Sequence, residues 1–309
     1  MGPGAGVLSI PPASVPLSFL ATAGAGLVAF GLAVAVVADD VTVAPTHPHV
    51  TATAHVAMLA FLTMAVAGAL HQFGPVVGQR RLRSIAVARL SWIGLAVTTT
   101  LLPLGFARGE EDLIPVGGLI GAATVSLIVW NLSGPLGRQA SGVPVWGLRL
   151  SVTLLLATVG FGVTYAFNRQ TGWFPLYPHR LLAHVHLGLF GWLGVTYAAV
   201  AEKLWPMFLL AHRPRARSGA VAVAGMASGT AILATGLVFD LRALIVIGAI
   251  GIAIGIAGHV TSLCGAVRHR RRRLELLHVA LFVSAAFLLV AVACALIAGI
   301  ADVRPVVRS

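Results

Sequence analysis

Hydrophobic residues occur along this chain in runs of about 20, and short polar gaps separate the runs. A helix of about 20 apolar residues can cross the hydrocarbon core of a bilayer. The pattern therefore predicts an all-α polytopic membrane protein with a single membrane domain over residues 1–309. We expect nine transmembrane helices, at about 15–38, 50–74, 85–107, 112–136, 145–168, 180–203, 217–239, 242–266 and 274–300.

The composition agrees with this prediction, and in a membrane protein the net positive charge has a different interpretation than in a soluble one. Hydrophobic residues make up 58% of the chain and charged residues 10%, and the mean hydropathy is +0.94. A net charge of +12 would suggest a nucleic-acid partner in a soluble chain, but here the basic residues lie mostly in the gaps between helices. We therefore expect the lipid bilayer as partner and no nucleic acid.

Basic and acidic residues alternate between successive gaps. Arginines fill the even-numbered gaps, near residues 80–83, 138, 213–217 and 268–273, whereas acidic residues fill odd-numbered gaps, at 39–40, 110–112 and 240. Loops rich in Lys and Arg stay on the cytoplasmic side of a membrane. The pattern predicts a protein of the cell membrane with a cytoplasmic N-terminus and an external C-terminus. The starts of the second and sixth helices then face outward.

The sequence also matches itself when it is shifted by 131 residues without a gap. The shift superimposes His55 on His186, Phe61 on Trp192, Pro75 on Pro206, Thr99 on Thr230 and Gly105 on Gly236. Regular self-similarity indicates an internal repeat. We predict two tandem four-helix repeats, at about 15–136 and 145–266, and one additional C-terminal helix at about 274–300. Since each repeat has an even number of helices, both have the same orientation, about a pseudo-twofold axis along the membrane normal.

Histidines at membrane depth are candidates for function, because burying a polar group in hydrocarbon costs free energy unless it meets a partner or ligand. His55 and His186 both lie in the first turns of their helices, and the repeat relates one to the other. This arrangement suits two axial ligands of one haem iron. An interhelical hydrogen-bonded pair is the alternative. The histidines at 47, 49, 179, 212 and 269 are expected to be hydrated.

The segment AHVHLGLFGWLGVTYAAVAEKLWPMF, residues 183–208, resembles the His-x-His helix of subunit I of the haem–copper oxygen reductases. It is most similar to that of the C-type (cbb-type) cytochrome c oxidases. The resemblance implies that His55 and His186 hold a low-spin haem b and that His184 is a candidate ligand of a second haem iron. The family uses its four-helix unit three times, so this chain would be a shortened relative.

The chain departs from that family at the copper site, which needs an adjacent His-His pair and a histidine on a further helix. No HH occurs here, and the predicted helix at 217–239 has no histidine. No copper site is recognised, which disfavours a copper-dependent oxygen reductase. The expected cofactor is therefore haem b, with one group expected and a second left open. Arg180 is near enough in sequence to hold a propionate.

The leading hypothesis is a membrane b-type haem protein that acts in electron transfer or in handling of O2 or NO. Enzymatic turnover is left open; an enzyme of this kind would be a haem-dependent oxidoreductase, with a partner subunit or redox protein as candidate partner. A haem A synthase-like enzyme is one alternative, although that family has histidines in both even helices of each half and residues 112–136 have none. A non-haem metal or solute transporter is another.

Four further polar residues lie in or near the predicted spans: His71, Glu202, His259 and His278. His71 and its repeat equivalent Glu202 are expected to lie at the inner interface, where they would cap helix ends. His259 and His278 have no histidine as repeat equivalent, so either could supply a second ligand for an iron bound by His184.

Overall fold

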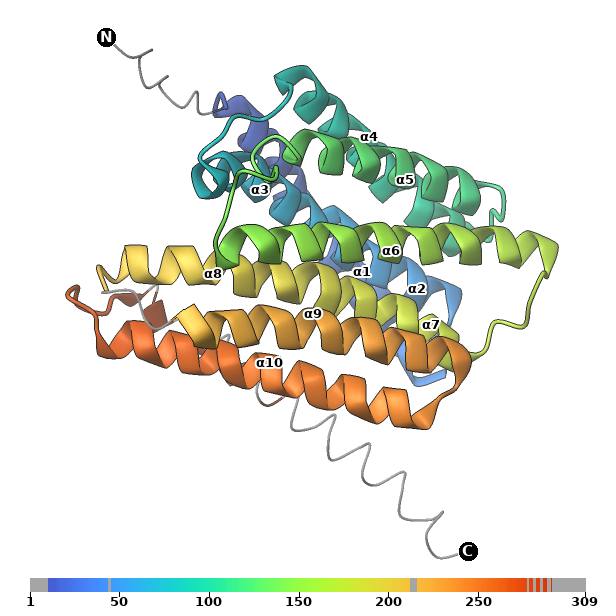
Figure 1. Ribbon diagram of the computed structural model, residues 1–309. Coiled ribbons are helices and arrows are strands. Elements are labelled where there is room, and N and C mark those ends of the chain that lie inside the picture. Colours follow the sequence, from blue (N-terminus) through green and yellow to red (C-terminus); the bar gives the residue numbers. More distant parts are fainter. Residues whose placement is uncertain are drawn as a thin grey trace, which may run out of the picture.

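The computed structural model describes residues 11–43, 46–211 and 216–276, with isolated positions up to 290. Within these residues every regular element is a helix, and eight helical spans are long and apolar enough to cross a membrane (Figure 1). The prediction of an all-α polytopic membrane protein is therefore confirmed. The predicted ninth span, about 274–300, lies largely outside the described residues.

The eight spans agree closely with the first eight predicted helices. Two of them, the second and the sixth, each contain a π-helical segment between two α-helices. In the first half the elements are α1 (Ser14–Val43), α2 (Pro48–His55), η1 (Val56–Thr63), α3 (Met64–Gly78), α4 (Ile85–Arg108) and α5 (Leu113–Leu132). In the second half they are α6 (Val143–Thr171), α7 (Pro178–His186), η2 (Leu187–Gly194), α8 (Val195–Phe208), α9 (Ala216–Phe239) and α10 (Arg242–Arg268).

These elements recur at the same 131-residue spacing as the sequence matches. The π-helix η1 begins directly after His55 and η2 directly after His186, and each is eight residues long. The bounds of α4, shifted by 131 residues, coincide with those of α9. Because π-helical segments are rare and often lie at functional sites, their recurrence at one register supports the predicted duplication.

Local sequence signals explain where several helices begin and end. The Ser84 hydroxyl accepts a hydrogen bond from the Val87 amide at 3.2 Å and caps the start of α4. Pro48 and Pro178 occupy the first positions of α2 and α7, where a missing N–H costs nothing. Gly172 ends α6 with a φ of +62°, a left-handed conformation that glycine adopts without strain.

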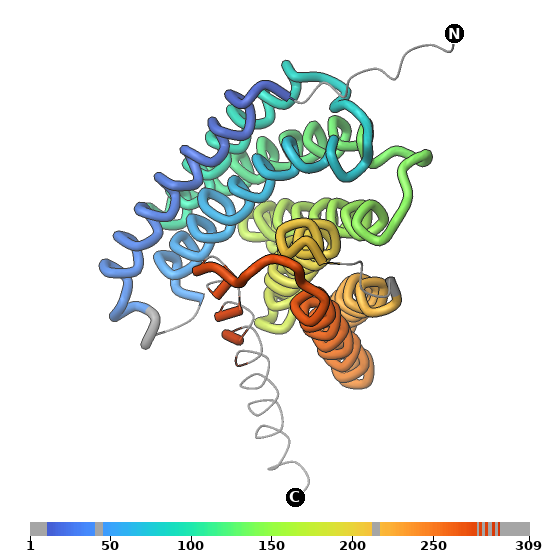
Figure 2. Tube along the Cα trace, turned by 90° about the vertical axis from the view of Figure 1, so that its left-hand side faces the viewer, coloured from blue at the N-terminus to red at the C-terminus, as the bar shows by residue number. Residues whose placement is uncertain are grey.

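The two halves pack against each other at the centre of the bundle. In the first half α1 lies on η1 and α3, and α4 pairs with α5; in the second half α9 pairs with α10. Figure 2 shows α6 between the first four spans and the rest of the second half. The π-helices η1 and η2 also contact each other there. At this contact the buried Trp192 indole N–H donates a hydrogen bond to the Thr63 hydroxyl at 3.2 Å.

Glycines allow α9 and α10 to approach until their backbones touch. A Cβ added to Gly229 would lie 2.5 Å from the Ile252 amide nitrogen, and one added to Gly251 would lie 2.9 Å from the Gly229 Cα. Small residues let membrane helices gain close van der Waals contact where lipid supplies no hydrophobic driving force.

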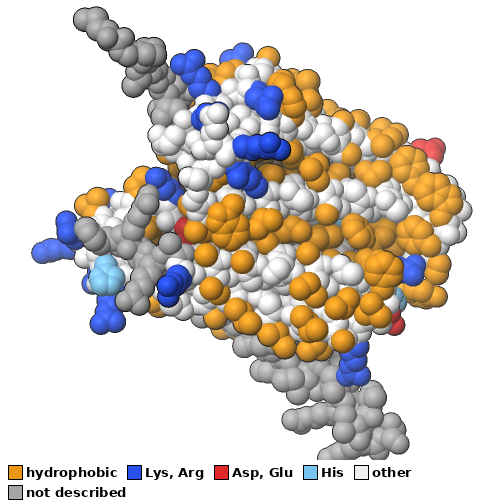
Figure 3. Space-filling view, in the orientation of Figure 1, with side chains coloured by type: hydrophobic (Ala, Val, Ile, Leu, Met, Phe, Trp, Pro, Cys, Tyr) orange, Lys and Arg blue, Asp and Glu red, His pale blue; other side chains and the backbone are white. Residues whose placement is uncertain are grey.

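Charged side chains separate toward the two ends of the bundle. In Figure 3 most of the Lys and Arg side chains in view gather at the end that holds the α3–α4 and α5–α6 connections, and hydrophobic side chains cover the middle. The acidic residues Glu110, Glu111 and Asp112 lie at the opposite end, between α4 and α5. The starts of α2 and α7 lie at this acidic end (Figure 1).

Candidate functional site

His55 is the last residue of α2, and its own helix fixes the orientation of its ring. The Nδ1–H group donates a hydrogen bond to the Thr51 carbonyl at 2.8 Å, one turn earlier. The ring also stacks on Phe106 of α4, with centroids 5.1 Å apart and an interplanar angle of 20°. Because Nδ1 carries the proton, the lone pair of the imidazole is on Nε2, the atom that can bind a metal.

The ring beside His55 is that of His184, from α7. The two ring centroids are 6.5 Å apart, at an interplanar angle of 28°. The Nδ1–H of His184 donates to the Thr158 carbonyl of α6 at 3.0 Å, so this ring is oriented by a neighbouring helix. A Cβ added to Gly162 of α6 would lie 3.1 Å from the His184 ring, so the absence of a side chain at this position makes room for the ring. The second and sixth spans thus present two imidazoles, each with Nδ1 engaged and a lone pair on Nε2.

His186 has a different environment. Its Nδ1–H donates to the Leu182 carbonyl at 2.7 Å, and its ring stacks on Phe190 with centroids 5.8 Å apart. Two positions along an α-helix turn a side chain by about 200°, so His184 and His186 point in nearly opposite directions. The sequence paired His55 with His186, whereas the structure brings His55 together with His184.

Arg180 lies one turn before His184 on α7 and has an unused donor. Its Nη1 donates to the Pro175 carbonyl at 2.9 Å, and its guanidinium lies 5.4 Å from the Tyr177 ring centroid. Its Nε is buried and has no hydrogen-bond partner. The Tyr165 hydroxyl donates to the Arg180 carbonyl at 2.6 Å, and the Tyr165 ring contacts His184 edge-on. A fixed positive charge with a free N–H, this close to the histidines, suits an anionic group.

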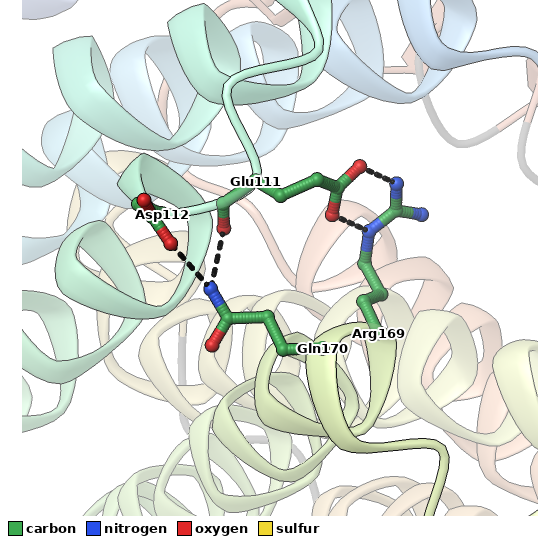
Figure 4. Close-up of polar contacts among 4 residues, drawn as sticks. All are labelled: Glu111, Asp112, Arg169 and Gln170. Carbon is green, nitrogen blue, oxygen red and sulfur yellow. Dashed lines mark hydrogen bonds and ion pairs between the residues drawn. The ribbon is translucent and has the colours of Figure 1, made fainter.

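A polar cluster ties the α4–α5 connection to the end of α6 (Figure 4). Arg169 donates from Nε and Nη2 to the two carboxylate oxygens of Glu111, at 2.9 and 2.5 Å. The Gln170 amide donates to the Glu111 carbonyl at 3.2 Å and to Asp112 Oδ1 at 2.9 Å. The hydrogen bond from Arg169 lowers the pKa of the Glu111 carboxyl. Arg169 therefore uses Nε and Nη2 in its ion pair with Glu111, whereas the Nε of Arg180 has no hydrogen-bond partner.

The same cluster supports the aromatic wall of the histidine pair. The Arg169 guanidinium lies 5.5 Å from the centroid of Phe106, the ring that stacks on His55. A cation–π contact stabilises the position of an aromatic ring by about 0.5–1 kcal/mol at exposed sites. An α6 residue from the second half thus steadies the surroundings of a first-half histidine.

His71 lies deep in the bundle, near the basic end. It has no exposed surface in the bundle, and its expected position at the inner membrane interface stays a prediction. The Nδ1–H donates to the Ala67 carbonyl at 2.7 Å, and the ring stacks on Phe19 with centroids 5.1 Å apart. Its Nε2 is buried without a hydrogen-bond partner.

Glu202 and His259 line one small cavity between α8 and α10. The cavity has a volume of about 10 Å3, close to that of a single water site, and Ser262 also lines it. His259 is 3% exposed and neither of its ring nitrogens has a hydrogen-bond partner. Its ring contacts Tyr197, which lies 13 residues after His184, or about 20 Å along the helix. His259 therefore does not fit as a second ligand at His184.

A third group, where α1 ends and α2 begins, was missed in the sequence. Asp40, His47 and His49 place one donor atom each within 4.8 Å of one another. The two histidines were expected to be hydrated individually. The spacing Asp-x6-His-x-His could have suggested the cluster, but only if the turn between the helices had been known.

No protein-family model matches this chain, and no curated protein matches it either. The resemblance of residues 183–208 to subunit I of the haem–copper oxygen reductases therefore stays a prediction made from the sequence.

Proposed function

We propose that this protein is a membrane-embedded b-type haem protein whose iron is held between the second and sixth spans by His55 and His184. The observation that carries the proposal is the separation of the two rings, 6.5 Å between centroids. At this separation both imidazoles, each with its Nε2 lone pair free, would hold the iron of one haem. Both Nδ1 atoms donate to backbone carbonyls, the usual outer contact of a metal-bound histidine.

The residues around the pair also suit a haem. Phe106 offers an aromatic surface beside His55, and Tyr165 borders His184. The Nε of Arg180 has no hydrogen-bond partner and could bind a propionate carboxylate. When bound, the haem would supply one-electron redox chemistry or an iron for a gaseous ligand, and these residues would bind it, orient it and balance its charge.

This proposal changes one ligand that the resemblance implied. The family pattern gives His186 to the low-spin haem and His184 to a second iron. Here His186 packs on Phe190, and His184 is the neighbour of His55. We therefore assign one haem b to His55 and His184, and His186 is not a ligand of this haem. Electron transfer, or handling of O2 or NO, follows as the proposed activity, with a redox protein or partner subunit as its counterpart.

The decisive experiment is an absorbance spectrum of the purified protein and its histidine variants. We expect a Soret band of six-coordinate low-spin haem b, lost in His55→Ala and in His184→Ala but retained in His186→Ala. Because either substitution destroys the shared site, the double variant should lose no more than each single one. Loss of the band in His186→Ala with retention in His184→Ala would restore the ligand pair predicted from the sequence.

A colourless protein would refute the haem assignment altogether. If expression with ample haem gives a colourless preparation, and both alanine variants keep full stability, the metal or solute transporter becomes the better hypothesis. A native-state ligand that bridges two spans stabilises their association, so haem loss should also lower thermal stability.

The proposed orientation places the haem toward the outside of the cell membrane. The basic end of the bundle, with the α3–α4 and α5–α6 connections, would be cytoplasmic under the positive-inside rule, and the starts of α2 and α7 would be external. A reporter that works only after export should be active when inserted in the α6–α7 connection and inactive in the α5–α6 connection. The reverse pattern would invert the topology.

A further inference from the structure

The side chains of Asp40, His47 and His49 converge where α1 ends and α2 begins. His49 Nδ1 is 2.9 Å from Asp40 Oδ2, and His47 Nδ1 is 3.6 Å from the same oxygen. The two histidine rings meet edge to face, with centroids 5.0 Å apart. All three donor atoms lie within 4.8 Å of one another. We propose that Asp40, His47 and His49 form a binding site for one divalent transition-metal ion, Zn2+ or Cu2+.

The distances are close to those that a shared metal requires. In a tetrahedral zinc site with bonds of about 2.0–2.1 Å, neighbouring donor atoms are about 3.3 Å apart. The distances from Asp40 Oδ2 to His49 and His47, 2.9 and 3.6 Å, lie on either side of this value. Small side-chain rotations would therefore bring both imidazoles and the carboxylate onto one ion, with a fourth position left for water.

A hydrogen bond alone does not account for the cluster. The contact between His49 and Asp40 at 2.9 Å is a hydrogen bond that would join the two helices by itself. His47 Nδ1 is shielded from solvent, yet it has no hydrogen-bond partner. A buried nitrogen without a partner costs free energy, and a metal ion would turn it into a ligand.

The local charge also favours a cation. Asp40 and the adjacent Asp39 bring two carboxylates to the last turn of α1, whose C-terminal dipole attracts positive charge. The positive end of the α2 dipole repels a cation. It is equivalent to about half an elementary charge, which is less than the negative charge of the two carboxylates. Two imidazoles and one carboxylate suit Zn2+ and Cu2+, whereas Mg2+ and Ca2+ prefer oxygen ligands alone.

This site is separate from the proposed haem site. His49 lies six residues before His55, or about 9 Å along the helix toward the acidic end of the bundle. The proposal does not depend on haem, and it can be tested in the His55→Ala background.

The test is metal binding by protein purified with a tag that contains no histidine. After treatment with a chelator, Zn2+ binding is measured by calorimetry, and Cu2+ coordination by electron paramagnetic resonance. We expect one tightly bound equivalent in the parent protein and at least tenfold weaker binding in Asp40→Asn, His47→Ala and His49→Ala. The Cu2+ spectrum should show two nitrogen ligands in the parent and one in either histidine variant.

His179→Ala is the matched control, because His179 is another histidine at the acidic end, partly exposed, where it stacks on Tyr177. This variant should bind both metals like the parent. Equal affinity in all variants, or no binding in the parent, would overturn the metal site. Either result leaves the haem spectrum unaffected, so failure of one proposal can be told from failure of the other.

Discussion

The hydrogen bond between Trp192 and Thr63 gives a direct test of how the two halves are joined. The Trp192 side chain of η2 donates to Thr63 at the end of η1, and the two residues are 1% and 3% exposed. Thr63→Val removes the acceptor with little change in shape, and Trp192→Phe removes the donor and keeps an aromatic ring. We expect each substitution to lower the free energy of unfolding. The double variant should lose less than the sum of the two single losses.

The expected coupling follows from the surroundings of the bond. A buried N–H left without an acceptor costs about 1–3 kcal/mol. Double-mutant cycles on hydrogen bonds between membrane helices average about 0.6 kcal/mol and reach about 1.7 kcal/mol. Because both residues are almost fully buried and join the second span to the sixth, we expect a coupling free energy of about 0.6–1.7 kcal/mol between them.

The measurement is reversible unfolding of each variant in mixed micelles with increasing SDS, followed by circular dichroism. Thr98→Val is the matched control: Thr98 is equally buried, but its hydroxyl donates to the Gly94 carbonyl of its own helix at 2.9 Å. Its effect should add to that of Trp192→Phe within about 0.3–0.5 kcal/mol. If the losses of Thr63→Val and Trp192→Phe add as closely as those of Thr98→Val and Trp192→Phe, the hydrogen bond does not couple the two halves.

Three other predictions concern packing, a loop and pH. Gly251→Leu should lower thermal stability in detergent by about 1–3 kcal/mol, because its Cβ would meet the α9 backbone at 2.9 Å; Gly31→Ala, with nothing within 4 Å, should have little effect. Arg149→Lys should destabilise by about 1–3 kcal/mol, since Arg149 donates three hydrogen bonds to carbonyls of the α5–α6 connection, and full stability would contradict this role. Arg169 lowers the pKa of Glu111, so the pair should stabilise the protein above the usual carboxyl pKa of 4.5 and lose this effect as the pH falls. Thermal unfolding between pH 3 and 7 should show a difference below about 1 kcal/mol, absent in Glu111→Gln, because both side chains are well exposed.

Sequence alone predicted the eight described spans to within a few residues at most of their ends, as for α4, predicted at 85–107 and found at Ile85–Arg108. This success has a local cause. A stretch of about 20 apolar residues must become a helix in a bilayer, because its backbone polar groups have no other partners. The register of 131 residues was also visible in the sequence, and the π-helices η1 and η2 recur at the same spacing.

The tertiary structure decided which side chains meet. The pseudo-symmetry of the sequence favoured His55 with His186, but the ring beside His55 belongs to His184, whose orientation is set by the Thr158 carbonyl of another helix. Likewise Asp40, near the end of α1, meets His49 at the start of α2. Hydropathy fixes which residues enter the bilayer, but the rotation of each helix about its axis depends on contacts between distant segments. A π-helical segment adds to this, because its wider turn changes the phase of every residue that follows it.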